Sequence, residues 1–240
     1  MSFNEDWEEQ ADNWLAWART PGHDAYWQYS PRLFELVPDP GDRTLDLGCG
    51  EGRVSRDLAA RGHRVTAVDG SPTLLAAARE AQDDVEFLLA DAADLPFSDE
   101  TFDLAVAYNV LMDVQDMPGA IHEVARVLRP GGRFCASVTH PLADAGKFEA
   151  REPDAPFIVR GSYFGPRRFD ETFQDKGLTM RFRGWCYSLE EYSRAIENAG
   201  FLVEALREPR QTDEAVATDP AEARWRRIPL FLFMRLRKPS

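Results

Sequence analysis

Residues 45–52 read Leu-Asp-Leu-Gly-Cys-Gly-Glu-Gly, an apolar run that passes into a glycine-rich loop. Glycines carry no Cβ atom, so the backbone here can turn tightly and approach a ligand closely. A helix expected over 53–60 would direct its free N–H groups toward the same place. The glycines follow the spacing G-x-G-x-G, and Arg53 stands where a dinucleotide-binding loop has its third glycine. The loop therefore indicates a bound ligand and disfavours NAD or FAD.

Short apolar segments alternate with helical patterns along most of the chain. Strands are expected over 45–48, 65–69, 85–89, 102–107, 133–138, 201–206 and 230–236. Helices are expected over 53–60 and 72–81, and two later ones carry the apolar stripes Ile121, Val124, Ala125, Leu128 and Leu189, Tyr192, Ile196, Ala199. This alternation predicts right-handed crossovers and a parallel sheet, an α/β fold.

Carboxylates follow the second and third predicted strands. Asp69 ends the strand over 65–69, where it could accept both hydroxyls of a ribose or, alternatively, only cap the next helix. Asp91 follows the strand over 85–89 and could accept a hydrogen bond from an exocyclic amine such as that of adenine. Because open α/β sheets bind ligands at the carboxyl ends of their strands, the glycine loop and both carboxylates are expected at one site.

Two regions fall outside the alternation. Residues 1–40 hold four tryptophans among acidic residues, and we expect one or two amphipathic helices that cover the domain. Residues 140–187 show no clean period, and a long irregular stretch of this kind predicts a lid or binding insertion. The expected organisation is a single domain over 1–240, with a cover (1–40), a ligand-binding core (41–139), a substrate lid (140–187) and a C-terminal part (188–240).

Composition and charge limit the classes of molecule that the chain is expected to bind. The chain has 240 residues and a formal net charge of −13, which disfavours nucleic acid. Its longest apolar run, 230–234, is far below the ~20 residues of a membrane-spanning helix, so no membrane partner is expected. The three cysteines are widely spaced, which argues against a disulfide framework or a zinc site and favours the reducing cytoplasm. No carboxylate–histidine cluster indicates a metal.

Four segments, in this order, resemble one known family. They are LDLGCGEGR (45–53), VTAVDGSP (65–72), DAADLPFSDETFD (91–103) and EVARVLRPGGRF (123–134). Together they resemble the class I S-adenosylmethionine (SAM)-dependent methyltransferases, in particular the small-molecule branch with the LDLGCGEG signature. The resemblance covers roughly residues 43–138. It implies a Rossmann-like, doubly wound seven-stranded sheet whose last strand (230–236) is antiparallel.

The resemblance also implies SAM as cofactor and assigns ten positions to it. These are Asp46, Gly48, Cys49 and Gly50 around the methionine part; Asp69, Gly70 and Ser71 at the ribose; Asp91 and Ala92 at the adenine; and Asn109, whose backbone would face the methionine end.

Catalytic and acceptor-binding residues are less sharply indicated. His140 follows the fifth predicted strand and could be a general base, or else a histidine that orders the lid. Tyr163, Phe164 and Trp185 could line an acceptor pocket or form the core of the lid. The lid arginines could bind an acidic acceptor or pair with surface carboxylates.

The leading hypothesis is methyl transfer from SAM to an oxygen, nitrogen or carbon of a small-molecule acceptor. A sulfonium already activates the methyl group, so the protein needs mainly to place the nucleophile in line with it. The alternatives are a SAM- or S-adenosylhomocysteine (SAH)-binding protein without turnover and, less favoured by the glycine spacing, an NAD-dependent oxidoreductase. The cover and the lid together favour an enclosed site and hence a small acceptor.

Overall fold

The computed structural model describes residues 3–82 and 84–240; the first two residues of the predicted cover and Asp83 lie outside the described residues. Its centre is a sheet of seven strands in the order β10-β11-β5-β4-β1-β2-β3. Their bounds are β1 (Thr44–Leu47), β2 (Val65–Asp69), β3 (Glu86–Leu89), β4 (Phe102–Tyr108), β5 (Leu128–Thr139), β10 (Leu202–Arg207) and β11 (Phe231–Arg237).

The direction of the strands confirms the predicted fold class. Strands β1 to β5 pair in parallel, and β11 runs antiparallel to both β5 and β10. All four residues of β1 are buried, as expected for a central parallel strand that helices cover on both faces. The fold is therefore the Rossmann-like doubly wound sheet with an antiparallel last strand.

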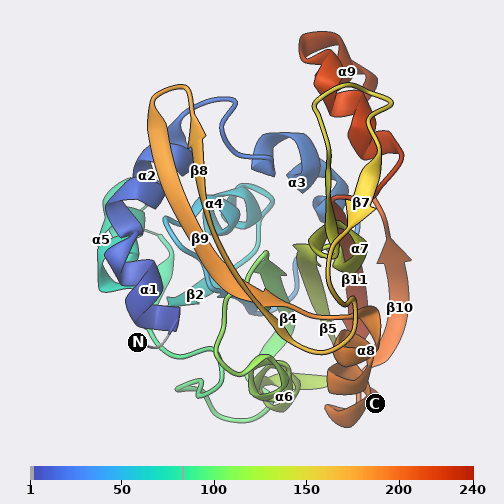
Figure 1. The fold of residues 1–240 in the computed structure, drawn as a ribbon. Helices are drawn as coiled ribbons and strands as arrows, with labels where there is room; N and C mark the ends of the chain where they lie inside the picture. Colours follow the sequence, from blue (N-terminus) through green and yellow to red (C-terminus); the bar gives the residue numbers. More distant parts are fainter. Residues whose placement is uncertain (1–2, 83) are drawn as a thin grey trace.

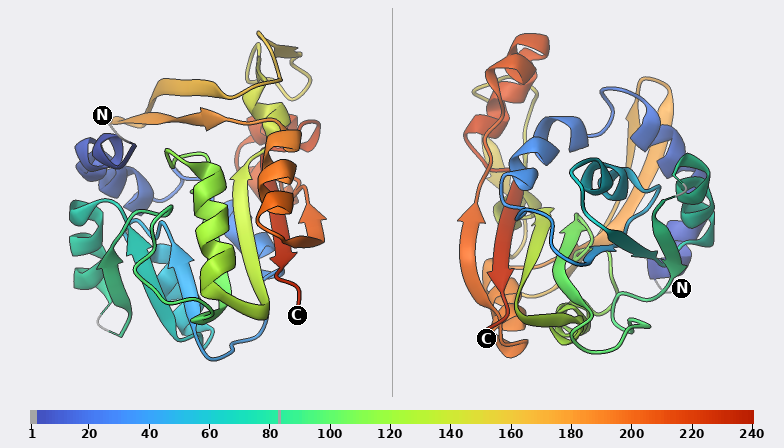
Figure 2. Two further views of the ribbon diagram at one scale, coloured as in Figure 1. Left: turned by 90° about the horizontal axis from the view of Figure 1, so that it is seen from below. Right: turned by 180° about the vertical axis from the view of Figure 1, so that it is seen from behind.

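Helices cover both faces of the sheet (Figure 2). On one face α6 (Met117–Val127) and α8 (Leu189–Asn198) pack their apolar stripes against Leu45 and Leu47. The other face holds α3 (Tyr26–Phe34), α4 (Arg53–Ala60) and α5 (Pro72–Ala81). The carboxyl ends of β1, β2 and β4 remain between these two layers, where the glycine loop and Asp69 lie.

The N-terminal cover contains one helix more than expected. Within the described residues it comprises α1 (Phe3–Glu9), α2 (Ala11–Arg19) and α3. The prediction of one or two helices was wrong because the helical segment is interrupted twice, at Gln10 between α1 and α2, and at Pro21 and Gly22 (φ +79°) between α2 and α3. Only α3 joins the main core, through the fully buried Tyr26 and Leu33.

The lid is more regular than the sequence predicted. It contains α7 (Pro141–Asp144) and two antiparallel hairpins, the short β6 (Gly146–Phe148) with β7 (Phe157–Val159), and the long β8 (Arg167–Asp175) with β9 (Leu178–Cys186). Lys176 and Gly177 join β8 to β9 with φ values of +44° and +86°. Positive φ at both central residues is the geometry of a type I′ hairpin turn, so the prediction of an irregular stretch was wrong here.

The long hairpin spans the ligand-binding edge of the sheet. Figure 1 shows it crossing the front of the molecule from α2 at one end to α8 at the other. Its tip contacts the N-terminal cover, because His23 Nε2 lies 3.1 Å from the Asp175 carbonyl and Lys176 Nζ donates to the Gly22 carbonyl at 3.3 Å. Lid and cover therefore meet above the carboxyl ends of the strands.

The C-terminal part follows the prediction except between its last two strands. Helix α8 is followed by Gly200 at φ +79°. The segment between the last two strands, for which no element was expected, contains α9 (Asp213–Thr218) and the 3₁₀ helix η1 (Pro220–Arg226). In the described part of the chain, every helix is too short or too polar to cross a membrane.

Candidate functional site

A cavity of about 470 Å³ opens at the carboxyl ends of β1, β2 and β4. Its walls come from the N-terminal cover, the glycine loop, the end of β2, the loop after β4 and the β8–β9 hairpin. Among the ten positions that the resemblance assigns to SAM, eight line this cavity. They are Gly48, Cys49, Gly50, Asp69, Gly70, Ser71, Ala92 and Asn109.

The glycine loop has a backbone that other residues could adopt only with strain. Gly48, Gly50 and Gly52 have φ values of +66°, +55° and +86°. At Gly48 a Cβ atom would in addition lie 2.5 Å from Cγ1 of Val110. Cys49 fixes the loop to the neighbouring strand, since its N–H donates to the Val68 carbonyl at 2.9 Å. The loop is thus held in one conformation beside the cavity.

Asp69 lies at the end of β2 with both carboxylate oxygens held by the backbone. The N–H of Gly50 donates to Oδ2 at 2.7 Å, and the N–H of Ser71 donates to Oδ1 at 2.9 Å. Burial raises the pKa of Asp69, while the N–H groups of Ser71, Gly50 and Gly70 oppose that rise. Each oxygen keeps a further lone pair, so the carboxylate can accept two hydroxyl donors from a ligand in the cavity.

Ser71 connects the site to the N-terminal cover. Its hydroxyl oxygen accepts from the N–H of Leu74 at 3.1 Å and so caps α5. The same hydroxyl donates to the carboxylate of Glu8, which also accepts from the N–H of Thr73 at 3.2 Å. Helix α1 is therefore attached to the loop that follows Asp69, and it bounds the cavity on that side.

Asp46 lies outside the cavity lining. Side chains alternate along a strand, so Asp46 points away from the face that holds Leu45 and Leu47. Its carboxylate accepts from the Ser55 hydroxyl of α4 at 2.5 Å and is 1% exposed. Burial raises the pKa of Asp46 to about 7. This geometry holds α4 against β1, so the predicted contact of Asp46 with the methionine part of SAM gains no support.

The raised pKa of Asp46 predicts a pH-dependent cost to stability. The pKa is about 7 when folded and about 3.9 when unfolded. The folded state therefore binds this proton more tightly, and the contribution to stability is full below pH 4 and lost as the pH rises to 7. We expect the free energy of unfolding of the wild type, relative to Asp46→Asn, to fall by a few kcal/mol between pH 4.5 and about 8.

Urea unfolding of both proteins at these two pH values measures this difference. The other buried carboxyls of the site are present in both proteins, so their titration largely cancels. The prediction would be contradicted if the difference in free energy of unfolding between the wild type and Asp46→Asn were the same at both pH values. A difference that shifts in favour of the wild type at the higher pH would contradict it as well.

Asp91 lies outside the cavity lining, whereas Asn109 is part of it. Asp91 is exposed, accepts from the N–H of Ala93 at 2.9 Å and does not line the cavity, whereas its neighbour Ala92 does. Asn109 lines the cavity with a left-handed backbone, φ +55°. Its Oδ1 accepts from the Ser137 hydroxyl at 2.6 Å. The side chain of Asn109 and its N–H, which donates to the Ser137 carbonyl at 2.9 Å, are thus both engaged with β5, so only its carbonyl is left for contact with a ligand.

His140 is engaged away from the cavity through both ring nitrogens. Nδ1 accepts from the N–H of Leu142 at 3.0 Å and caps α7, and Nε2 lies 2.9 Å from Oε1 of Glu208. Burial lowers the pKa of His140, and Glu208 opposes that change. His140 does not line the cavity. This geometry favours the alternative in which the histidine orders the start of the lid over the general base.

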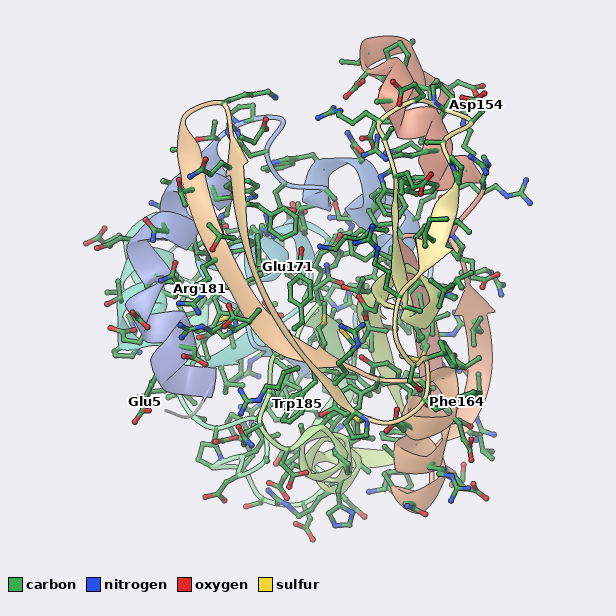
Figure 3. The ribbon with its side chains drawn as sticks, in the orientation of Figure 1. Glu5, Asp154, Phe164, Glu171, Arg181 and Trp185 are labelled. Atoms are coloured by element: carbon green, nitrogen blue, oxygen red, sulfur yellow. The ribbon has the colours of Figure 1, made fainter. Side chains whose placement is uncertain are left out.

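Only one of the three predicted acceptor residues lines the cavity, namely Trp185. The Tyr163 hydroxyl accepts from the N–H of Leu189 at 3.0 Å, which fixes the lid to the start of α8. Phe164 is 74% exposed. In Figure 3 its label lies beside α8, away from that of Trp185, which belongs to β9. The geometry places Tyr163 and Phe164 in the outer part of the lid.

Four aromatic residues of the β8–β9 hairpin, Phe169, Phe173, Phe182 and Trp185, line the cavity and are called the aromatic roof below. Its three phenylalanines were not identified from the sequence. Phe182 of β9 lies within 6.5 Å, centroid to centroid, of Trp7, Trp14 and Trp17 of the cover. Phe169 and Phe173 of β8 also line the cavity. These phenylalanines lie on one face of the hairpin, but Glu171 stands on that face between Phe169 and Phe173, so no regular apolar alternation marks them in the sequence.

Three of the lid arginines are paired with acidic groups or stacked on the lid itself. Arg181 donates to Asp170 at 2.7 Å, and Arg183 pairs with Asp6 of α1. The Arg168 guanidinium stacks 4.7 Å from the centroid of the Trp185 ring. These contacts favour the alternative in which the arginines stabilise the surface and fasten lid to cover.

Near α3, three polar atoms of the cavity wall have no hydrogen-bond partner among the described residues. They are the Tyr108 hydroxyl, His23 Nδ1 and Arg53 Nη1. Nη2 of Arg53 pairs with Asp24 at 2.7 Å. Buried polar groups are nearly always hydrogen-bonded, so this end of the cavity fits a ligand that carries charged or polar groups. In the described part of the chain, no three His, Cys, Asp or Glu side chains gather as metal ligands would.

Comparisons with known proteins find similarity to methyltransferases. Residues 45–136 match the family described as a methyltransferase domain. The chain is 39% identical over 126 residues to the demethylmenaquinone methyltransferase of Clavibacter sepedonicus, covering 50% of this chain and 51% of that protein. It is 42% identical over 93 residues to the malonyl-[acyl-carrier protein] O-methyltransferase of Serratia marcescens, covering 39% of this chain and 36% of that one.

The chain thus matches about half the length, or less, of these curated relatives. Among solved structures, a SAM-dependent methyltransferase from Mesorhizobium loti superposes with a TM-score of 0.71 and 27% sequence identity, covering 89% of this chain and 98% of that one. That likeness extends well beyond residues 45–136.

Proposed function

We propose that the chain is a class I SAM-dependent methyltransferase that transfers a methyl group from SAM to an oxygen, nitrogen or carbon of a small-molecule acceptor. The observation that carries this proposal is the position of Asp69 and the glycine loop on the wall of one cavity. Bound SAM would supply a methyl group already activated by a sulfonium. The protein would then act mainly by binding, orienting and excluding water.

The residues present fit SAM in three parts. Asp69 would accept the ribose hydroxyls, with Gly70 and Ser71 beside it, and Ala92 would meet the adenine. The unpartnered groups of Arg53, Tyr108 and His23 fit the charged amino-acid end. Asp91 would contact the adenine by turning its exposed side chain toward the cavity.

The aromatic roof favours an acceptor with an apolar ring or chain. Phe169, Phe173, Phe182 and Trp185 provide such a surface, and the cover and the lid close the cavity from above. The relative from Clavibacter acts, by its name, on demethylmenaquinone, which supports an apolar acceptor of that kind. The relative from Serratia acts, by its name, on a malonyl-[acyl-carrier protein], an acidic acceptor that a chain of net charge −13 would attract poorly.

The proposal is tested with purified protein, SAM and a panel of phenols, quinols and amines, by following the formation of SAH. We expect SAM to bind in the micromolar range and SAH to accumulate with at least one acceptor above the acceptor-free background. Binding of SAM with no turnover of any acceptor would favour the non-catalytic alternative. Binding of NAD in place of SAM would overturn the proposal.

A further inference from the structure

Five carboxylate side chains line the cavity, and two of them lack the partners that the other three have. Asp24 pairs with Arg53 at 2.7 Å, Glu51 pairs with Arg56 at 2.7 Å, and Asp69 is held by backbone N–H groups. In the described part of the chain, no hydrogen bond or ion pair reaches the carboxylates of Asp113 and Asp144. These two groups are therefore free to bind a ligand.

The two free carboxyls interact electrostatically with each other and with a third unpartnered group. Burial and the charge of Asp144 raise the pKa of Asp113 well above its ordinary value. Tyr192 of α8 is fully buried, and its hydroxyl has no hydrogen-bond partner among the described residues. Burial raises the pKa of Tyr192 well above its ordinary value, and the charges of Asp144 and Asp113 add to that rise. Asp113 and Asp144 are thus half-buried on the cavity wall, Tyr192 is fully buried, and none of the three groups has a hydrogen-bond partner among the described residues.

The junction between lid and core holds Asp113 in this place. The N–H of Asp113 donates to the Val110 carbonyl at 2.7 Å, which closes the turn after β4. The N–H of Trp185 donates to the Met112 carbonyl at 2.8 Å and fastens β9 to that turn. A Cβ atom on Gly184 would lie 2.8 Å from Oδ1 of Asp113, so only glycine lets the lid strand approach so closely.

Burying a carboxyl group without a partner costs free energy, and a ligand that supplies the missing hydrogen bond removes part of that cost. The same cavity is lined by the phenylalanines of the β8–β9 hairpin and by Trp185. We propose that Asp113, supported by Asp144, binds the reacting group of the methyl acceptor, and that this group is a hydroxyl or an amine on an apolar body and not a carboxylate. The inference rests on the proposed methyl transfer.

Asp113 would also take the proton that the acceptor loses. The acceptor oxygen or nitrogen forms the new bond to the methyl carbon as the bond between carbon and sulfur breaks, and that electron pair stays on sulfur. The proton of a hydroxyl acceptor would pass to the carboxylate of Asp113 as the bond forms, and an ammonium acceptor would first lose one proton to that carboxylate, which frees the nitrogen lone pair for the attack. Burial raises the pKa of the neighbouring Asp144 to about 7, while Arg167 opposes the rise, so carboxyls in this place can accept a proton near neutral pH.

Four probes that share one apolar body separate the possible acceptors. They are para-propylphenol, para-propylbenzylamine, para-propylbenzoate and propylbenzene. Their binding to the SAH-saturated protein is followed by tryptophan fluorescence, since Trp185 and three tryptophans of the cover line the cavity. We expect the phenol or the benzylamine to bind at least ~10-fold more tightly than the benzoate and the hydrocarbon. Which of the two binds better distinguishes a hydroxyl from an amine acceptor.

Asp113→Asn should abolish this preference and leave the affinity for SAH within about threefold of the wild type. Asp144→Asn should reduce the preference, and Asp154→Asn, an exposed aspartate far from the cavity (Figure 3), should leave it unchanged. Asp113→Asn and Asp144→Asn each replace a carboxyl group that has no partner, so neither should lower the melting temperature. The melting temperature therefore serves as the folding control. Equal or tighter binding of the benzoate, a preference that survives in Asp113→Asn, or no binding by any probe would overturn the inference. Failure of the wild type to bind SAH would instead refute the proposed function.

Discussion

Replacing Asp69 with alanine is expected to weaken the binding of SAH by about 100-fold or more. The carboxylate lines the cavity, and its two oxygens can each accept a ligand hydroxyl while the backbone holds them in place. A hydrogen bond to a charged group contributes about 1.5–3 kcal/mol, and a tenfold change in affinity corresponds to about 1.4 kcal/mol. Loss of two such bonds therefore exceeds the effect of any other single contact in the site.

Isothermal titration calorimetry with SAH measures this loss without an acceptor. Asp94→Ala is the matched control, because Asp94 is an exposed carboxylate on the next strand's loop and does not line the cavity. Asp69→Asn keeps one acceptor oxygen and should fall between the wild type and the alanine variant. A dissociation constant for Asp69→Ala within threefold of the wild type, with a cooperative melt, would show that Asp69 does not bind the ribose.

The cofactor half of the site could be predicted because its residues lie in short contiguous motifs. The glycine loop and Asp69 each follow a buried strand directly, and parallel strands bring such neighbours to the same edge of the sheet. The direction in which a side chain points was harder to infer. Asp46 belongs to the same motif, yet the alternation along β1 directs it to Ser55 of α4 and away from the cavity.

The acceptor half could not be predicted because distant segments build it. Nothing near Asp113 in the sequence marks it as buried, since the lid strand at Gly184 covers it only in the fold. The hairpin itself lacked a visible period because most of β8 is exposed, so charged residues fill the positions between its phenylalanines. The turn at Lys176 and Gly177 was the local signal that a hairpin was present.

His140 shows a third reason why the role of a residue could not be predicted from the sequence. Its place after the fifth strand suggested a general base, because that is where the cavity opens. The side chain is instead bonded to the N–H of Leu142 and to Glu208. Both partners become neighbours only when α7 and the segment after β10 are folded, and no local pattern near His140 indicates them.

Gly48→Ala is expected to cause the largest loss of stability among substitutions of one methyl group in the site. At φ +66° a residue with a Cβ atom loses about 1–2 kcal/mol. The added atom would also lie 2.5 and 2.6 Å from the two methyl carbons of Val110, and such overpacking costs about 1–3 kcal/mol. We expect the free energy of unfolding in urea to fall by about 3 kcal/mol or more.

Two further variants separate the two causes. Gly177→Ala introduces the same change at φ +86° with no heavy atom within 4 Å of the new Cβ, so it should cost only the backbone strain, about 1 kcal/mol. Val110→Ala removes the two methyl groups that the new Cβ atom at position 48 would meet. In the Gly48→Ala background it should therefore recover part of the lost stability, whereas alone it should be destabilising because Val110 is buried. Equal losses for Gly48→Ala and Gly177→Ala, or strictly additive effects of the pair at 48 and 110, would mean that the loop relaxes away from Val110. In that case the glycine would be required for the turn alone and not for the close approach of the loop to the strand.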